Sequence, residues 1–282
     1  MINLSIIIVS WNVQEALQEN LSRLFALDTS MNIEVIVVDN ASMDGTRSMI
    51  RTEFPQVELI VNDWNSGFAY ACNQGLSMAK GDVMLLLNPD MLVGEGTFDR
   101  THELLTQNSS MGVLGVKLIG ADGGPIGSVR RAPGLSDQLA ILLKVPHLVK
   151  LKSLDRYHAT EMQYGLSQKV DQVRGSYFAF RREIMDTVGL FDERFHLWFE
   201  EVDYCRRVRE AGYEIHYCSD VSCKDLVGKS FAQLGVGKKQ RIFSSSMIKY
   251  FKKWHPWWEV AIIRVAQPVA IVSGYVHDVI KR

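Results

Sequence analysis

Asp90 follows a short apolar run, Val83–Leu87, that closes on the turn Asn88-Pro89-Asp90. Such a run predicts a strand covered by helices on both faces, and open α/β sheets bind ligands where such strands end. Pro89 fixes its own φ and favours an extended Asn88, so Asp90 is presented on a stiff turn. Its carboxylate is suited to hold a metal ion or a sugar hydroxyl. The alternative is an Asp that only caps the next segment.

Glu200 and Glu201 are adjacent carboxylates at the start of a predicted helix. The helix dipole at this end favours two ionised carboxylates, while their mutual repulsion could raise the pKa of one of them. A carboxylate with a raised pKa can take a proton from a hydroxyl group, as a general base does. Asp203 faces another side of the same helix, so we expect it to pair with Arg206 or Arg207.

A further carboxylate, Asp39, follows the apolar run Ile33–Val38 and opens the turn Asp39-Asn40-Ala41-Ser42. In a crevice it could accept the imide N–H of uracil or thymine. The alternative is a helix N-cap, because Asp, Asn and Ser all cap well. Both can hold, with Asp39 facing a ligand and Ser42 or Asp44 capping the next helix.

These groups need a scaffold that brings strand ends together, and residues 4–87 supply one. Segments of helical periodicity separate the apolar runs Leu4–Val9, Ile33–Val38, Val57–Val61 and Val83–Leu87. This order predicts a parallel sheet with right-handed crossovers, helices on both faces and a nucleotide-sized crevice where the strands end. Neither G-x-G-x-x-G after the first strand nor G-x-x-x-x-G-K-[ST] occurs, which argues against dinucleotide and P-loop sites.

Residues 97–217 continue the pattern less regularly. Thr97–Gln107 is predicted to be a helix, and Gly112–Ile119 and Val173–Phe180 are predicted strands. Leu135–Val149 is apolar and is expected to form a helix beside the site. Lys152–Gln172 is polar and irregular, a candidate mobile loop.

The chain has 282 residues, which suits one large α/β domain or a domain with an appendage. Hydrophobic residues make up 47% and charged residues 22%, so a full core is expected. A net charge of −1 argues against binding to nucleic acid. The 4 cysteines form no C-x-x-C pair, so we expect buried free thiols in a reducing cytoplasm rather than a zinc or redox site.

From residue 229 the chain becomes basic and rich in tryptophan. Trp254, Trp257 and Trp258 stand before the apolar stretch Val260–Val279. Aromatic residues at headgroup depth and cations toward anionic lipid are typical of an interfacial helix, so we predict peripheral membrane contact through this tail. Polar residues and a proline interrupt the stretch and disfavour a true span: Arg264, Gln267, Pro268 and His277. The alternative is a pair of C-terminal helices packed on the domain.

Taken together, the motifs resemble the family 2 glycosyltransferases of the GT-A fold, and most closely their bacterial rhamnosyltransferase-like branch. The segments that carry the resemblance are SIIIVSWN, VVDNASMDGT, NSGFAYACNQGLSMAKGDVMLLLNPD, RGSYFAFRREIMDTVGLFDERF and WFEEVDYCRRVREAGYEIHY. They occur in the expected order over roughly residues 3–230, and an ordered set is more specific than any one motif. The resemblance implies a Rossmann-like, mostly parallel α/β sheet, a nucleoside-diphosphate sugar donor, Mg²⁺ or Mn²⁺, and inversion at the anomeric carbon.

The resemblance also implies roles for single residues. Asp39 corresponds to the aspartate that contacts the base, and Asp90 to the metal- and diphosphate-binding residue of the D-x-D motif. Glu201 occupies the second acidic position of the E-D-x-D motif, which carries the catalytic base, and Glu200 stands beside it. Further residues are expected to bind the donor nucleotide: Ser10, Asn12, Asn65, Gly67, Asn73, Asn88 and Lys229.

Two positions depart from the family pattern. Asn88 replaces the leading carboxylate of D-x-D, and an amide oxygen binds a metal more weakly than a carboxylate does. Asp225 stands where the family often has a histidine ligand, and it can still bind Mg²⁺ or Mn²⁺ through oxygen. Cationic side chains could instead neutralise the diphosphate directly: Lys224, Lys229, Arg130 and Arg131.

We therefore predict an inverting hexosyltransferase, with a GT-A domain over residues 1–228 and a helical, amphipathic tail over residues 229–282. The expected donor is dTDP-rhamnose, with a UDP-sugar as the alternative. The expected acceptor is a saccharide or a polyprenyl-linked saccharide in bacterial surface polysaccharide synthesis, at the cytoplasmic face of the cell membrane. The rival interpretations are a non-catalytic nucleotide-sugar binding module and a sugar-nucleotide pyrophosphorylase. The latter needs a glycine-rich loop with Arg and Lys where Ser10-Trp11-Asn12 stands.

Overall fold

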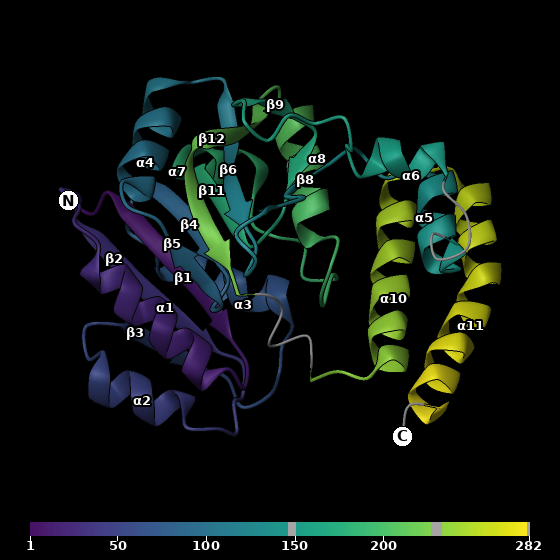
Figure 1. Ribbon diagram of the computed structural model, residues 1–282, viewed down its shortest axis with the longest axis horizontal. Coiled ribbons are helices and arrows are strands. Elements are labelled where there is room, and N and C mark those ends of the chain that lie inside the picture. The colour runs from purple at the N-terminus through teal and green to yellow at the C-terminus, as the bar shows by residue number, and fades with distance from the viewer. Residues whose placement is uncertain (146–150, 227–232, 281–282) are drawn as a thin grey trace.

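The computed structural model describes residues 1–145, 151–226 and 233–280, which surround a large mixed sheet (Figure 1). The strands are β1 (Leu4–Ser10), β2 (Ile33–Asp39), β3 (Glu58–Val61), β4 (Val83–Leu87), β5 (Met91–Val93), β6 (Met111–Ile119), β7 (Pro125–Ile126), β8 (Val129–Arg130), β9 (Gln168–Val170), β10 (Gln172–Val173), β11 (Tyr177–Arg181) and β12 (Glu214–Asp225). In this part of the chain the main sheet has 10 strands, and its path runs β3-β2-β1-β4-β11-β6-β12-β5. β7 pairs with β6 and β9 with β12, while β8 and β10 form a separate pair.

The parallel half of the sheet confirms the predicted scaffold. β1 pairs in parallel with β2 and β4, and β2 with β3. The register sets Ser10 opposite Asp39, so the ends of these two strands coincide. Beyond β4 the sheet becomes mixed, because β11 runs antiparallel to both β4 and β6. Because β1, β2, β3 and β4 are parallel, their carboxyl ends meet at one edge of the sheet, as predicted.

Helices cover both faces of the sheet (Figure 1). They are α1 (Gln14–Ala26), α2 (Thr46–Glu53), α3 (Phe68–Met78), α4 (Thr97–Gln107), α5 (Leu135–Leu142), α6 (Lys152–Tyr157), α7 (Arg182–Val188), α8 (Glu200–Glu210), α10 (Val236–Trp254) and α11 (Trp257–Ile280). Ile6 and Ile8 of β1 belong to the core that includes α1, α2 and α4, whereas Ile7 belongs to the core that includes α3, α7 and α8. Because both sides of β1 are buried, its apolar run has no alternation.

Two predicted segments differ from the structure. The helix expected over Leu135–Val149 ends at Leu142, and residues 146–149 of that prediction lie outside the described part. The stretch Lys152–Gln172 is not a loop throughout, because it contains α6 and β9. β9 forms by pairing with β12, with Val170 opposite Ile215. Because β9 is polar and its partner strand is distant in the sequence, no local run of apolar residues predicts it.

The C-terminal segment forms a helical hairpin beside the sheet, with α10 between the sheet and α11 (Figure 1). A third core joins this hairpin to α5 and to the start of α8, and includes Phe199, Phe251 and Ile263. A Cβ added at Gly274 would lie 3.0 Å from the Cα of Gly237, so the two helices pack closely there. The tail is thus a helix pair packed on the domain, as the alternative interpretation predicted. The 4 cysteines are buried and free, as expected.

Candidate active site

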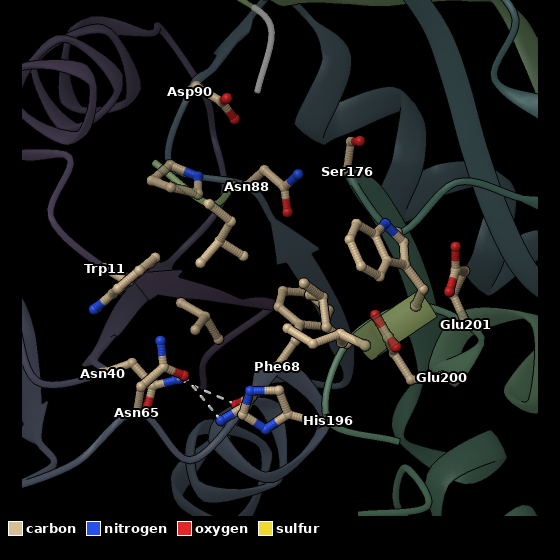
Figure 2. A pocket seen from close by; sticks show the side chains of 18 of the residues that line it. Trp11, Asn40, Asn65, Phe68, Asn88, Asp90, Ser176, His196, Glu200 and Glu201 are labelled. Atoms are coloured by element: carbon tan, nitrogen blue, oxygen red, sulfur yellow. Dashed lines mark hydrogen bonds between the residues drawn. The ribbon is translucent and has the colours of Figure 1, made fainter. Parts of the chain in front are cut away.

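A cavity of about 370 Å³ opens at the carboxyl ends of β1 and β4, where the sequence predicts the crevice. Figure 2 shows its polar side chains in separate zones. Trp11 and Asn65 lie toward one end, and Asp90 lies at another. Glu200 and Glu201 stand side by side on a further wall. This separation allows a nucleoside, a diphosphate and a reacting hydroxyl group to occupy different zones of one cavity.

Ser10 and Asp39 lie next to the Trp11 end and are fully buried. Asp39 Oδ2 accepts hydrogen bonds from Arg47 Nε at 2.6 Å and from Ser42 N at 3.1 Å. Within the described residues, Ser10 Oγ and Asp39 Oδ1 have no hydrogen-bond partner. Buried polar atoms without a partner are rare, so this pair marks a place where a ligand can supply one. Neither side chain lines the cavity as described, so contact with a base requires a local shift.

The loops after β1 and β2 are tied together by short polar contacts. Asn12 N donates to Ser42 Oγ at 2.9 Å, and Asn12 Oδ1 accepts from Met43 N at 2.7 Å. The N-cap position of α2 is Gly45 rather than the predicted Ser42 or Asp44, and Asp44 Oδ1, one residue earlier, accepts from Thr46 N at 3.1 Å. Asn12 therefore holds the loops in place, and its side chain is not part of the cavity lining as described.

The segment Asn65–Asn73, predicted to line the nucleotide, divides into two roles. Asn65 and Gly67 line the cavity, and Asn65 Oδ1 accepts from Gly67 N at 3.1 Å. Gly67 has φ +89°, and a Cβ there would lie 2.5 Å from His196 Nδ1, so only glycine fits. Asn73 instead bonds the backbone of Phe191 through both amide atoms, at 2.9 Å each. The structure places Asn73 in a packing contact outside the described lining.

Asp90 and Asp225 come together beyond the end of β4. β12 runs antiparallel to β5 and sets Asp225 opposite Met91. Leu226 N donates to the backbone oxygen of Asp90 at 3.0 Å. Both aspartates are buried, and Arg174 Nη1 lies 3.8 Å from Asp225 Oδ2. The backbones around two aspartates 135 positions apart in the sequence thus lie side by side, with a cation near Asp225.

The donor atoms at this site fit a hard divalent cation. Asp90 and Asp225 supply carboxylate oxygens, and Asn88 lines the adjoining cavity with an amide. The described residues contain no cluster of three or more His, Cys, Asp or Glu side chains that could hold a metal. Mg²⁺ is commonly held by one or two carboxylates, with phosphate and water in its other positions. Two aspartates therefore suffice when a diphosphate completes the coordination.

Two cations that the sequence prediction did not single out line the cavity, namely Arg174 and Lys238. Arg174 opens the segment RGSYFAF just before β11, so its place at a strand entrance was an available signal. Lys238 lies on α10 and has no comparable signal, because only the packing of the tail brings it to the cavity.

Three of the cations predicted to neutralise a diphosphate, Arg130, Arg131 and Lys224, are not part of the described cavity lining. Arg130 donates to backbone carbonyl groups of its own loop, and Arg131 pairs with Glu161 at 3.3 Å. Lys224 is an exposed residue of β12. Lys229 falls outside the described residues. Among the described residues, the arginine and lysine side chains that line the cavity are Arg174 and Lys238.

Glu200 and Glu201 open α8, and the Oε2 atom of each has no hydrogen-bond partner within the described residues. Burial, and then the charge of Glu201, raises the pKa of Glu200 well above its usual value. Burial also raises the pKa of Glu201, but backbone hydrogen bonds and the nearby Arg174 and Arg130 oppose the rise. The expectation that the helix dipole keeps both ionised is corrected, because burial outweighs it. The two arginines favour the ionised form of Glu201.

The turn that leads into this pair has an unusual backbone. Trp198 and Phe199 have φ values of 65° and 72°, in the left-handed region. Bulky residues rarely adopt this conformation, which costs about 1–3 kcal/mol for each of them. Trp198 lines the cavity, whereas Phe199 is buried in the third core. Contacts around the turn must offset this cost.

Asp203 pairs with Arg207, whose Nε lies 3.0 Å from Asp203 Oδ2, and this confirms the predicted pairing. Asp203 is fully buried and has further partners on α10. Trp254 Nε1 donates to Asp203 Oδ1 at 2.8 Å, and Lys253 Nζ lies 2.8 Å from the same oxygen. The sequence does not indicate this link between the acidic motif and the tail.

The tail also forms part of the cavity wall. Leu234, Lys238 and Ile242 line the cavity, and Gln233 Nε2 donates to Asn12 O at 2.8 Å. The predicted division at residue 228 therefore does not separate the site from the tail.

Comparison with known proteins finds glycosyltransferases, in agreement with the resemblance of the motifs. The model of the family described as Glycosyl transferase family 2 matches residues 5–189. An N-acetylglucosaminyl-diphospho-decaprenol L-rhamnosyltransferase of Mycobacterium tuberculosis is 26% identical over 221 residues, which cover 74% of this chain and 71% of that protein. A low-salt glycan biosynthesis hexosyltransferase of Haloferax volcanii is 23% identical over 225 residues, which cover 78% of this chain and 66% of that protein.

Solved structures share the fold. A mannosyltransferase from Pyrobaculum calidifontis, in complex with GDP-Man and Mn²⁺, has a TM-score of 0.58 and 19% identity over 97% of this chain and 73% of its own. TarS residues 1–349 from S. aureus, in complex with UDP-GlcNAc, has a TM-score of 0.57 and 16% identity over 88% of this chain and 67% of its own. The α/β architecture predicted from the sequence is thereby confirmed.

Proposed function

Because the chain belongs to glycosyltransferase family 2, we propose that it transfers one sugar from a nucleoside-diphosphate sugar to a saccharide acceptor, with inversion at the anomeric carbon. The favoured donor is dTDP-rhamnose, since the motifs resemble the rhamnosyltransferase-like branch and the mycobacterial relative is named a rhamnosyltransferase. That name also specifies a polyprenyl diphosphate-linked acceptor, and we extend this acceptor class to the present chain. The product would enter bacterial surface polysaccharide.

The proposed chemistry is a single in-line displacement. Ionised Glu201 accepts the proton of an acceptor hydroxyl group, and the hydroxyl oxygen bonds to the anomeric carbon. The bond from that carbon to the diphosphate oxygen breaks, and its electron pair leaves with the diphosphate. Burial raises the pKa of Glu200 well above the usual value and so favours its protonated form, which can donate a hydrogen bond within the pair.

The diphosphate would lie toward Asp90 and Asp225, which we propose hold Mg²⁺ or Mn²⁺. A bound divalent ion supplies positive charge that stabilises the departing diphosphate. Arg174 and Lys238 face the same cavity and would bind phosphate oxygens directly. Ser10, Asp39, Asn65 and Gly67 remain the proposed contacts of the nucleoside.

One observation carries the proposal most strongly. Within the described residues the Oε2 atoms of Glu200 and Glu201 have no hydrogen-bond partner, and both side chains line the same cavity as Asp90 (Figure 2). Arg174 lines this cavity as well. A buried carboxylate without a partner destabilises a fold, so a site that keeps two of them is suited to chemistry on a ligand. A proton acceptor and a diphosphate site around one cavity are what an inverting transfer requires.

Thermal unfolding with a panel of nucleoside diphosphates tests the donor class. A ligand at 100 times its Kd stabilises the folded state by about 2.7 kcal/mol. For a domain of this size that raises Tm by roughly 5–10 °C. We expect such a shift with dTDP and Mn²⁺, a smaller one with UDP, and little with ADP. No shift with any nucleoside diphosphate contradicts the proposal, while a shift without sugar transfer favours the non-catalytic module.

We also propose that α11 contacts the cytoplasmic face of the membrane. The described residues contain one helix, over Trp257–Val276, that is long and apolar enough to cross a membrane; its mean hydropathy is 1.4 and 22% of it is buried. Most of its large exposed side chains are apolar, although Arg264 and Ser273 are exposed too; the apolar ones include Trp257, Trp258, Ile262, Val265, Val269, Val272 and Val276. Since α11 packs against α10 along its other side, a surface-lying helix fits this arrangement better than a span.

Replacing Val265 and Val269 together by glutamate should release the protein from vesicles. These side chains are 78% and 63% exposed, and each buried valine contributes about 1.5 kcal/mol or more to membrane binding. The double change should therefore lower the fraction that floats with phosphatidylglycerol vesicles at least tenfold. Leu166→Glu, at another exposed apolar residue, serves as the control. Equal flotation of wild type and double variant, or no flotation of either, rules out this contact.

A further inference from the structure

The strained turn before the catalytic pair is held from one side by α10. Ser246 Oγ, buried on α10, donates to Leu197 O at 2.8 Å, and Lys249 Nζ donates to Arg194 O. These bonds fix the backbone of the chain as it enters the turn. Both donors lie on a helix about 50 residues further along the chain, so the backbone of the turn depends on tertiary packing.

Aromatic packing holds the strained residues themselves. The ring of Phe243 on α10 lies 5.9 Å from that of Trp198, edge to face, and 5.6 Å from that of Phe199. Tyr250 contacts Phe199 from the next turns of the helix, with ring centroids 5.5 Å apart. Both left-handed residues therefore pack on one face of α10. If this face of α10 were absent, the strained left-handed backbone of Trp198 and Phe199 would lose the packing that stabilises it.

Asp203 holds the other side of the catalytic pair. Its backbone N–H donates to Phe199 O at 2.9 Å, which closes the first turn of α8. Its carboxylate accepts from Trp254 Nε1 at 2.8 Å and from Lys253 Nζ at 3.0 Å. The last turn of α10 is thus bonded to the first turn of α8, and Glu201 lies between this link and the strained turn.

We propose that α10 is the positioning element of the catalytic carboxylates, acting through Ser246 and Trp254 and the aromatic packing between them. The inference rests on the proposed function for Glu201, but the geometry that carries it is separate. Helix α10 contacts the chain before the pair at Leu197 and after it at Asp203. The tail is predicted to contact the membrane, and its first helix would in addition hold the catalytic carboxylates in place.

The proposal separates catalysis from donor binding. The nucleoside end of the cavity is built from β1, β2 and the start of α3, so loosening the 197–203 segment leaves its strands in place. A displacement of a catalytic group by about 1 Å can lower a rate about a hundredfold. Loss of the α10 contacts should therefore lower kcat while the Kd for a nucleoside diphosphate stays nearly constant.

The test uses the full chain and conservative changes on α10. Ser246→Ala removes the bond to Leu197, and Trp254→Phe removes the indole N–H bond to Asp203 while keeping an aromatic ring. Ser245→Ala is the matched control, since this neighbouring serine makes no such contact in the described structure. We expect the double variant S246A/W254F to lose about tenfold or more in kcat, with the Kd for dTDP within about twofold and S245A unchanged.

Hydrogen exchange of the amides of residues 197–203 supplies a second readout that does not depend on the reaction. In the double variant these amides should exchange at least tenfold faster than in S245A, while the amides of β1 and β2 keep their protection. Unchanged exchange, or faster exchange with wild-type kcat, overturns the proposal. A wild-type chain without transferase activity would refute the proposed function, and the exchange comparison would still decide whether α10 holds the turn.

Discussion

Replacement of Glu201 by glutamine should lower kcat by a factor of about 10²–10⁴, the usual contribution of a general base, and leave the Kd for the donor nucleotide within about twofold. Glutamine keeps the shape of the side chain but cannot accept a proton. Glu201 is the better base of the pair because Arg174 and Arg130 oppose the rise of its pKa, whereas the charge of Glu201 adds to the rise for Glu200.

The matched control is Glu210→Gln, at the far end of the same helix, where the glutamate is exposed and pairs with Arg206. This variant should keep wild-type kcat. Single-turnover transfer from the donor sugar to an acceptor is the measurement of choice, because it separates chemistry from product release. Turnover of Glu201→Gln at the wild-type rate would remove Glu201 from the mechanism.

The pH dependence of kcat should report the same group. Burial raises the pKa of Glu201 above its ordinary value of 4.5, and the base acts only when it is ionised. Activity should therefore be low under acidic conditions and rise with pH through an ionisation that lies above 4.5. In Glu201→Gln the residual activity should lack this acidic limb. A wild-type profile that falls as pH increases through this range would contradict the assignment.

Replacement of Asp90 by asparagine should lower turnover by about two orders of magnitude or more and abolish the effect of Mn²⁺ on nucleoside diphosphate binding. Charge stabilisation by a bound metal contributes several kcal/mol to transfer, and each 1.36 kcal/mol is a factor of ten in rate. With Asn88 already an amide, Asp90→Asn would leave Asp225 as the one carboxylate of this site. Asp225 also faces Arg174 at 3.8 Å, so it is poorly placed to hold the ion alone.

Isothermal titration of Mn²⁺ into the protein with dTDP present measures this effect without turnover. Asp186→Asn, an exposed change on α7, is the control and should titrate as the wild type does. Asp225→Asn should give a smaller loss than Asp90→Asn. Unchanged Mn²⁺ binding in Asp90→Asn would show that Arg174 and Lys238, rather than a metal at Asp90, neutralise the diphosphate.

Much of the fold could be predicted because its signals are local. The runs that became β1, β2 and β4 contain unbroken apolar stretches, since both faces of these strands are covered, whereas the edge strand β3 is only partly buried. The strand ends carry Ser10, Asp39 and Asn88-Pro89-Asp90, so the edge that forms the cavity could be located as well. Strand β9 could not be predicted, because its polar residues become a strand only by pairing with β12.

The site was also predicted only in part, because some of its residues carry local motif signals and others reach the cavity only through long-range packing. Asp90, Glu200 and Glu201 carry motif signals and line the cavity, and Asp225 lies beside Asp90 through the pairing of β12 with β5. Arg174 and Lys238 were missed as cavity cations. Asn12 and Asn73 carry motif signals, yet the structure uses their side chains in contacts that hold loops in place.

The sequence by itself determined the order of the elements and the kinds of chemical groups at the strand ends, because helix periodicity, strand runs and turn residues act over a few neighbouring positions. Only the tertiary structure decided how those groups behave. Burial of Glu200 and Glu201 reverses the expected effect of the helix dipole on their pKa values. The bond of Trp254 to Asp203, across 51 positions, makes the tail a support of the acidic motif. Such properties depend on long-range packing and desolvation, which no short stretch of sequence specifies.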